Sequence, residues 1–214
     1  MSSTPLVTER DMLDLLQTRY TRVRPATIAD RWTRAEHVGL QLGGPRKRVA
    51  DFIAADRYPN TAIPGGGASL HGHEIKISRQ DWLTELSDLS KANAFKQYMH
   101  HWWLVVPNQS IVAPHELPDG WGLMVISGDA LRVKISAPRL SPDPLPLELS
   151  ISLMAAAART AYRDPLHRDA PITHLKSVHE VRCGFCGAFG PCPLHQPRFH
   201  AERADRSDTI DARH

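Results

Sequence analysis

The sequence lacks long hydrophobic runs, and no stretch approaches the ~20 apolar residues that a membrane-spanning helix needs. Residues 1–5 carry neither the basic cluster nor the apolar core of a secretory signal peptide. We therefore expect a cytoplasmic protein with no membrane partner. Cysteine is also scarce, with three residues that all lie between Cys183 and Cys192. Because an odd, clustered set is a poor disulfide framework, a metal site is the better explanation.

Neither sign of charge dominates the chain. The formal net charge is +3, which permits a polyanionic partner without demanding one. The hydrophobic share of 42% and the charged share of 23% are those of an ordinary globular protein. A chain of 214 residues can form one well-buried domain with appendages, or two small domains.

The most informative stretch is 73–78, where polar and apolar residues alternate as in a strand with one buried face. Glu74 and Lys76 would project from the same face, because side chains two apart on a strand do so. Alone, this pair is most simply a surface ion pair of little energetic value. The pair becomes a candidate functional site because of Asp51, which places an acid inside another strand-like run, roughly 47–56. An acid followed by acid-x-lysine on the next strand is the outline of a metal-assisted phosphodiesterase.

Phosphodiester cleavage needs negative oxygens that hold a hard cation, and groups that stabilise charge on the attacking water and the phosphate. Asp51 and Glu74 would offer carboxylate oxygens to Mg²⁺ or Mn²⁺, with the carbonyl of Ile75 between them. Lys76 would face the water, which it could position or help to deprotonate.

Periodicity and turn residues predict the remaining elements. The expected order is a helix capped by Thr8, a helical or mixed segment over 30–42, strands over 47–56 and 73–78, helices over 79–89 and 91–100, and strands over 102–106, 121–127 and 131–136. This order favours an α/β sandwich with a mixed sheet. Glu36, in the helical or mixed segment, could add a carboxylate to the site, although a solvated helix acid is an equal alternative.

The composition divides the chain into five parts. We expect the α/β domain over 1–136, a proline-rich linker over 137–146, a helical extension over 147–175, a metal-binding knuckle over 176–200 and a disordered tail over 201–214.

With these residues in place, the chain resembles the PD-(D/E)xK nuclease superfamily, and in particular its MmcB-like DNA repair proteins. The resemblance covers roughly residues 10–136. Asp51 matches the first acid of the family motif, Glu74-Ile75-Lys76 matches its ExK, and Lys91 resembles the lysine of the next helix. Further matches are Ser78-Arg79-Gln80-Asp81-Trp82 after the ExK, Phe95 four residues after the lysine, the strand Trp103–Pro107 and the turn and strand Leu117–Leu123. The chain departs from the family in lacking a proline before the strand of Asp51 and in having Ala92 where tryptophan is usual.

The resemblance implies a restriction-endonuclease-like mixed sheet flanked by helices. It also implies a nuclease that uses Mg²⁺ or Mn²⁺ to act on DNA, in repair or recombination or in phage or defence DNA processing. Some members of the family have lost cleavage activity, so two alternatives stay open. One is a non-catalytic nucleic-acid binding module on this fold, and the other is a zinc-stabilised adaptor in a larger assembly.

A knuckle near the C-terminus has the spacing of a metal site. Its four candidate ligands form two pairs with two residues inside each pair, Cys183-Gly-Phe-Cys186 and Cys192-Pro-Leu-His195. A Cys₃His set is an ordinary structural zinc site, and so small a unit would depend on the metal for its folding. A redox CxxC would leave Cys192 and His195 unexplained. His179 or His200 could replace His195, and an iron–sulfur cluster, known in some nucleases of this superfamily, typically uses four cysteines. The knuckle could stabilise the C-terminus, touch nucleic acid or bind a protein partner.

Overall fold

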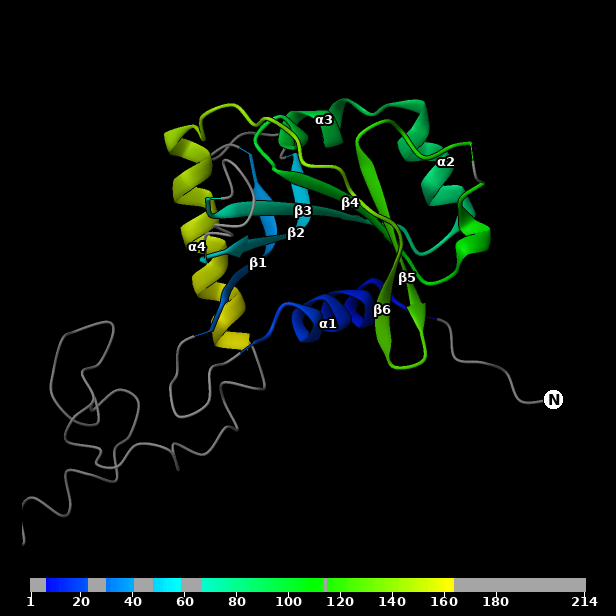
Figure 1. Ribbon diagram of the computed structural model, residues 1–214, viewed down its shortest axis with the longest axis horizontal. Coiled ribbons are helices and arrows are strands. Elements are labelled where there is room, and N and C mark those ends of the chain that lie inside the picture. Colours follow the sequence, from blue (N-terminus) through cyan, green and yellow to red (C-terminus); the bar gives the residue numbers. More distant parts are fainter. Residues whose placement is uncertain (1–6, 23–29, 41–47, 59–66, 114, 164–214) are drawn as a thin grey trace, which may run out of the picture. The chain divides into compact units, whose positions relative to one another are not determined.

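The computed structural model describes residues 7–22, 30–40, 48–58, 67–113 and 115–163 (Figure 1). These ranges hold four α-helices, one short 3₁₀ helix and six strands of one mixed sheet, which confirms the predicted α/β class. The elements are α1 (Glu9–Arg19), β1 (Trp32–Gly39), β2 (Val49–Asp56), β3 (Ser69–Ile75), α2 (Arg79–Ser87), α3 (Ser90–Lys96), β4 (His101–Val106), η1 (Gln109–Ile111), β5 (Trp121–Ser127), β6 (Ala130–Ile135) and α4 (Leu147–Arg163). All of these elements belong to one compact unit.

The sheet follows the order of the chain, β1-β2-β3-β4-β5-β6. β3, β4 and β5 run parallel to one another, whereas the β1–β2, β2–β3 and β5–β6 pairs are antiparallel. The crossover between β3 and β4 contains α2 and α3, as the connection between parallel neighbours requires. β3 is therefore an interior strand, and its C-terminal end meets the helices that follow it.

Buried side chains form a separate core on each face of the sheet. Met12 and Leu16 of α1 pack with Phe52 of β2 in one core, and Trp82 of α2 and Phe95 of α3 lie in the other. Figure 1 shows the same arrangement, with α1 on one side of the sheet and α2 and α3 on the other. The residues of each strand alternate between these two cores, so neighbouring positions on β2 and β3 face different helices.

The first helix begins where the sequence predicts. The hydroxyl of Thr8 accepts a hydrogen bond from the Asp11 N–H at 3.2 Å, and the Asp11 carboxylate accepts one from the Thr8 N–H at 2.8 Å. This reciprocal capping box satisfies two backbone donors that the helix cannot pair internally. It also fixes the position of Glu9, which follows the cap.

Three expectations about the elements need correction. Of the segment 30–42, the described residues 30–40 contain the strand β1 and no helix, because β1 pairs with β2, and this long-range pairing decides its conformation. The helix expected over 91–100 is shorter, since α3 ends at Lys96. The strand expected over 73–78 begins earlier and ends at Ile75, so Lys76 follows the strand.

The last described helix covers the edge strand β1, as Figure 1 shows. The Thr160 hydroxyl of α4 accepts a hydrogen bond from the Glu36 N–H at 2.8 Å, and Leu149 and Ala156 are buried in the core. α4 thus protects one edge of the sheet from pairing with other chains. None of the helices in the described ranges has the length and apolar character that crossing a bilayer would require.

Candidate active site

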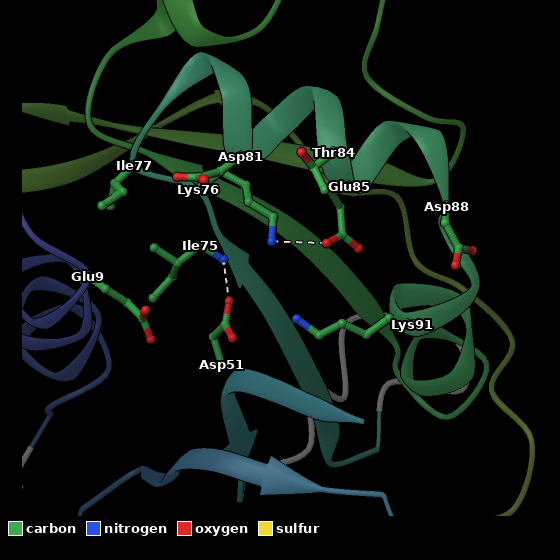
Figure 2. A pocket seen from close by; sticks show the side chains of 10 residues that line it. All are labelled: Glu9, Asp51, Ile75, Lys76, Ile77, Asp81, Thr84, Glu85, Asp88 and Lys91. Atoms are coloured by element: carbon green, nitrogen blue, oxygen red, sulfur yellow. Dashed lines mark hydrogen bonds and ion pairs between the residues drawn. The ribbon is translucent and has the colours of Figure 1, made fainter. Parts of the chain in front are cut away.

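A cleft of about 550 Å³ opens at the C-terminal end of β3, where α1, α2 and α3 approach the sheet. Its lining is rich in charged side chains (Figure 2), and the ten residues are Glu9, Asp51, Ile75, Lys76, Ile77, Asp81, Thr84, Glu85, Asp88 and Lys91. Three of the residues that the sequence predicts for the site, Asp51, Lys76 and Lys91, therefore line one cleft. The fourth, Glu74, is 1% exposed and forms contacts with both of these lysines.

Asp51 stands opposite Glu74 across two antiparallel strands. The register pairs Phe52 with His73, so the next position on each strand sets the two acids side by side on one face. The Asp51 Oδ2 accepts a hydrogen bond from the Ile75 N–H at 2.8 Å, which Figure 2 marks. Burial and the charge of Glu74 together raise the pKa of the Asp51 carboxyl to about 7. The site thus holds two neighbouring carboxyl groups whose negative charges repel each other.

Glu74 accepts hydrogen bonds from two lysines through one oxygen. Lys76 Nζ and Lys91 Nζ each lie 2.7 Å from Glu74 Oε1. The other oxygen, Oε2, is buried and has no hydrogen-bond partner among the described residues. Burial lowers the pKa of Lys76 and of Lys91, but the charge of Glu74, its hydrogen bonds and the neighbouring carboxylates together outweigh this effect, so both pKa values rise above the ordinary lysine value. Both ammonium groups are therefore charged at neutral pH.

Glu85 belongs to the cluster although the sequence analysis missed it. Its Oε2 lies 2.9 Å from Lys76 Nζ, and its side chain is 7% exposed. Burial, followed by the charge of Glu74, raises the pKa of the Glu85 carboxyl. The spacing in the helix predicted over 79–89 indicates this position. Glu85 lies three residues after Trp82, so it shares the buried face of α2.

Glu36 lies away from the cleft, contrary to the expectation that it adds a carboxylate there. It sits on β1, where its carboxylate accepts hydrogen bonds from Arg10 at 2.7 and 2.8 Å and from Gln17 at 2.6 Å. Both partners belong to α1, so Glu36 faces the side of the sheet that α1 covers. Burial raises the pKa of Glu36, but these hydrogen bonds outweigh it and the net pKa is lowered. Glu36 ties α1 to the sheet.

His71 and His73 lie on β3, which is an interior strand of the sheet. His73 is fully buried, with one ring nitrogen 2.9 Å from the Tyr20 hydroxyl and the other 3.2 Å from the Phe52 carbonyl oxygen. Burial lowers its pKa well below the usual histidine value, so the ring is neutral. It links α1 to the sheet and takes no part in the cleft.

The residues present fit a hard divalent cation that keeps part of its water shell. Magnesium is commonly held by one or two protein carboxylates together with water and substrate phosphates. Asp51 and the unpartnered Glu74 Oε2 match that donor set, and Ile75 directly follows Glu74 in the chain. Across the described ranges, no group of three or more His, Cys, Asp or Glu side chains could hold a metal ion. The predicted zinc ligands Cys183, Cys186, Cys192 and His195 lie outside those ranges.

Comparisons with known proteins leave the family open. No protein-family model matches the sequence, and no curated protein does either. Among solved structures, the chain is similar to the SPO1766 protein of unknown function from Silicibacter pomeroyi. The two share 16% sequence identity with a TM-score of 0.46, over 79% of this chain and 95% of that chain. No family assignment follows from these comparisons.

Proposed function

We propose that this protein is a divalent-metal-dependent nuclease of the PD-(D/E)xK type, similar to the MmcB-like proteins, which cleaves DNA with Mg²⁺ or Mn²⁺. The observation that carries the proposal is the pairing of Asp51 with Glu74 across β2 and β3, with Lys76 and Lys91 on the same carboxylate. This arrangement follows the order acid, acid-x-lysine, lysine that the sequence predicts. Repair, recombination and phage or defence DNA processing are the settings that the resemblance favours.

Each group of the cleft has a role in such a reaction. Asp51 and Glu74 would hold the ion, which when bound supplies a Lewis acid for the scissile phosphate. Lys76 is protonated, since its pKa is raised, so it would orient the attacking water and stabilise negative charge by donating hydrogen bonds. Lys91, which binds the same oxygen of Glu74, would contact a phosphate oxygen.

Acidic residues around the cleft make a cation necessary for binding DNA there. Glu9, Asp81 and Asp88 join Asp51 and Glu85 in the lining, against the two lysines. This excess of negative charge would repel a phosphate backbone. A divalent cation between the carboxylates removes much of that repulsion, so we propose that metal and DNA bind together.

Cleavage of labelled single-stranded and double-stranded DNA tests the proposal. The wild-type protein should cleave with Mg²⁺ or Mn²⁺ and not with EDTA. Asp51→Asn and Glu74→Gln should each reduce the rate by about 100-fold or more. Asp129→Asn, in the exposed turn between β5 and β6, removes the same charge far from the cleft and should leave the rate unchanged. Equal rates in all four proteins would show that any cleavage comes from elsewhere.

One observation favours a non-catalytic role as the second candidate. Two ammonium groups already bind Glu74, so its charge is compensated within the chain itself. A nucleic-acid binding module on this fold needs no catalytic ion, and it would contact DNA outside the acidic cleft. It would bind DNA by gel shift in the presence of EDTA, and neither metal would produce cleavage.

We also propose a structural zinc ion held by Cys183, Cys186, Cys192 and His195. The proposal rests on the paired ligand spacing and on the small size of the unit, whose folding would need the metal. The knuckle would serve as a contact for a protein partner, because few basic residues flank it. This zinc ion is separate from the ion proposed for the cleft.

A further inference from the structure

A second cavity of about 430 Å³ lies at the opposite end of β3 from the acidic cleft. It is lined by Ser69 and His71 at the start of β3, His101 at the start of β4 and Asp56 at the end of β2. Ser69 and Ile75 are six positions apart on β3, which is about 20 Å of extended strand. The two cavities are therefore separate sites, and a ligand in one does not touch the other.

The charge of this cavity is opposite to that of the cleft. Four arginines line it: Arg19, Arg22, Arg31 and Arg139. Asp56 is the single acidic side chain among the described lining residues, and Arg31 holds it in a two-pronged ion pair. With neutral histidines the lining thus carries an excess of three positive charges. Guanidinium groups gathered in this way favour an anion with several oxygens, because each offers planar pairs of N–H donors.

Two stacked histidines form one wall of the cavity. The rings of His71 and His101 lie 4.5 Å apart at an angle of 25°. His71 is held on both ring nitrogens, by the Ser69 hydroxyl at 3.1 Å and the Trp103 indole at 3.4 Å. His101 contacts the Ala137 carbonyl through Nδ1 at 3.2 Å, so Nδ1 carries the proton.

The hydrogen bond from His101 to the Ala137 carbonyl determines which ring nitrogen is protonated in the neutral ring. Because Nδ1 carries the proton in the neutral ring, Nε2 holds a lone pair and becomes a donor once the ring is protonated. Burial and then the charge of Arg139 lower the pKa of His101. A bound anion would oppose both effects, so the ring can supply a further donor when an anion is present.

We propose that this cavity binds the phosphate monoester of a nucleotide, either a free mononucleotide or the terminal phosphate of a DNA strand. A monoester is dianionic near neutral pH and so matches the charge excess better than a backbone diester does. The volume falls within the ~300–1,000 Å³ of small-molecule sites, which leaves space for a sugar beside the phosphate. The proposal does not require cleavage at Asp51.

Binding measured by calorimetry, with EDTA present, tests this site on the whole chain. The probes are inorganic phosphate, deoxyadenosine 5′-monophosphate, and one oligonucleotide with either a 5′-phosphate or a 5′-hydroxyl. The test variant combines Arg22→Gln with Arg139→Gln, whose side chains are both exposed. The matched control combines Arg132→Gln with Arg159→Gln, which removes the same charge from exposed positions outside the cavity.

We expect the test variant to bind the phosphate-bearing probes about tenfold or more weakly, as the loss of charge-assisted hydrogen bonds predicts, and the control to match the wild type. Tighter binding of the 5′-phosphorylated strand than of the mononucleotide would assign a strand end. Equal binding of the phosphorylated strand and the mononucleotide would indicate that the ligand is a free nucleotide. Either result supports the site. No binding of any phosphate-bearing probe, or an equal loss in the control, would overturn it. None of these results depends on nuclease activity, so a failure here is distinct from a failure of the proposed function.

Discussion

Lys76 and Lys91 bind the same oxygen of Glu74, each with its Nζ 2.7 Å from Oε1. One lysine follows the end of β3 and the other comes from α3, so the buried carboxylate fixes the position of both. Asp51 and Glu85 complete the cluster, which holds three carboxyl groups against two ammonium groups. When all are ionised the cluster carries one net negative charge. One divalent cation would reverse that sign and prepare the cleft for a phosphate.

Replacement of Lys76 tests whether the cluster is catalytic. Lys76→Met keeps the apolar stem and removes the ammonium group, so DNA cleavage should fall by about 100-fold or more through loss of charge stabilisation. Lys134→Met, on an exposed position of β6, should cleave as the wild type does. Rates are compared under single-turnover conditions, with circular dichroism confirming the fold. Full activity in Lys76→Met would exclude the proposed role.

Asp51 should make the protein less stable as the pH rises. Its pKa is about 7 in the folded state, against an ordinary aspartate value of 3.8. Between these pH values the folded state binds more protons than the unfolded state, so the free energy of unfolding falls from about pH 4 to about pH 7. Asp51→Asn has no carboxyl group that titrates at this position, so its free energy of unfolding does not fall in this way. At pH 8 it should be more stable than the wild type by at least about 1.4 kcal/mol, which is one pKa unit.

Urea denaturation at pH 5 and pH 8 measures this difference. The free energy of unfolding of Asp51→Asn should exceed that of the wild type by a large amount at pH 8 and by a small amount at pH 5. DNA cleavage should be lost at both pH values. Addition of Mg²⁺ at pH 8 should stabilise the wild type and leave the variant unchanged, because the ion needs the ionised carboxylate. A stability difference between variant and wild type that is the same at both pH values would contradict the raised pKa of Asp51.

The sequence was sufficient to predict the central residues of the cluster because strand periodicity determines which side chains share a face. Alternation over 73–78 predicts that Glu74 and Lys76 project together, and the two form a hydrogen bond. The acid inside the strand of Asp51 indicates the second carboxylate. Only the register of β2 against β3 places it opposite Glu74, and no local pattern gives a register.

The errors have the same physical origin. Glu36 lies in a segment whose local pattern is ambiguous, and its pairing with β2 and its ion pair with Arg10 depend on contacts far along the chain. Glu85 looks like an ordinary helix acid until α2 packs against the cleft. Long-range packing, which a single sequence does not show, decided each case.

The zinc proposal predicts a metal content. Purified protein should contain about one zinc ion per chain, as expected for a closed four-ligand site. Cys183→Ser combined with Cys186→Ser should remove it, because a tetrahedral site loses half of its ligands. His115→Gln, an exposed histidine elsewhere, should keep the zinc. Metal analysis after extensive dialysis distinguishes these results, and a zinc-free wild type would refute the proposal.

Gly72 leaves no space for a side chain on β3. A Cβ built there would lie 2.2 Å from a ring carbon of Trp102, which is fully buried. Gly72→Ala should therefore destabilise the fold by about 1–3 kcal/mol through overpacking. A Cβ at Gly67 meets nothing within 4 Å, so Gly67→Ala is the matched control and should change stability little. Thermal denaturation of both variants tests this; equal melting temperatures would mean that the Trp102 ring can shift.

In the proposed reaction Glu85 would act through Lys76, so it would be a positioning residue. Glu85→Gln preserves the shape of the side chain and removes the charge that holds Lys76 Nζ at 2.9 Å. We expect kcat to fall about tenfold, as for other residues that orient a reacting group, while KM for DNA changes by less than about twofold. Glu148→Gln, in the exposed first turn of α4, removes the same charge and should change neither constant. If Glu85 only supported the fold, its replacement would lower stability and the amount of active enzyme without changing the pH profile of the rate. In Glu85→Gln the pKa of Lys76 should fall, because one of its anionic partners is gone, and the rate should therefore begin to decline at a lower alkaline pH than in the wild type.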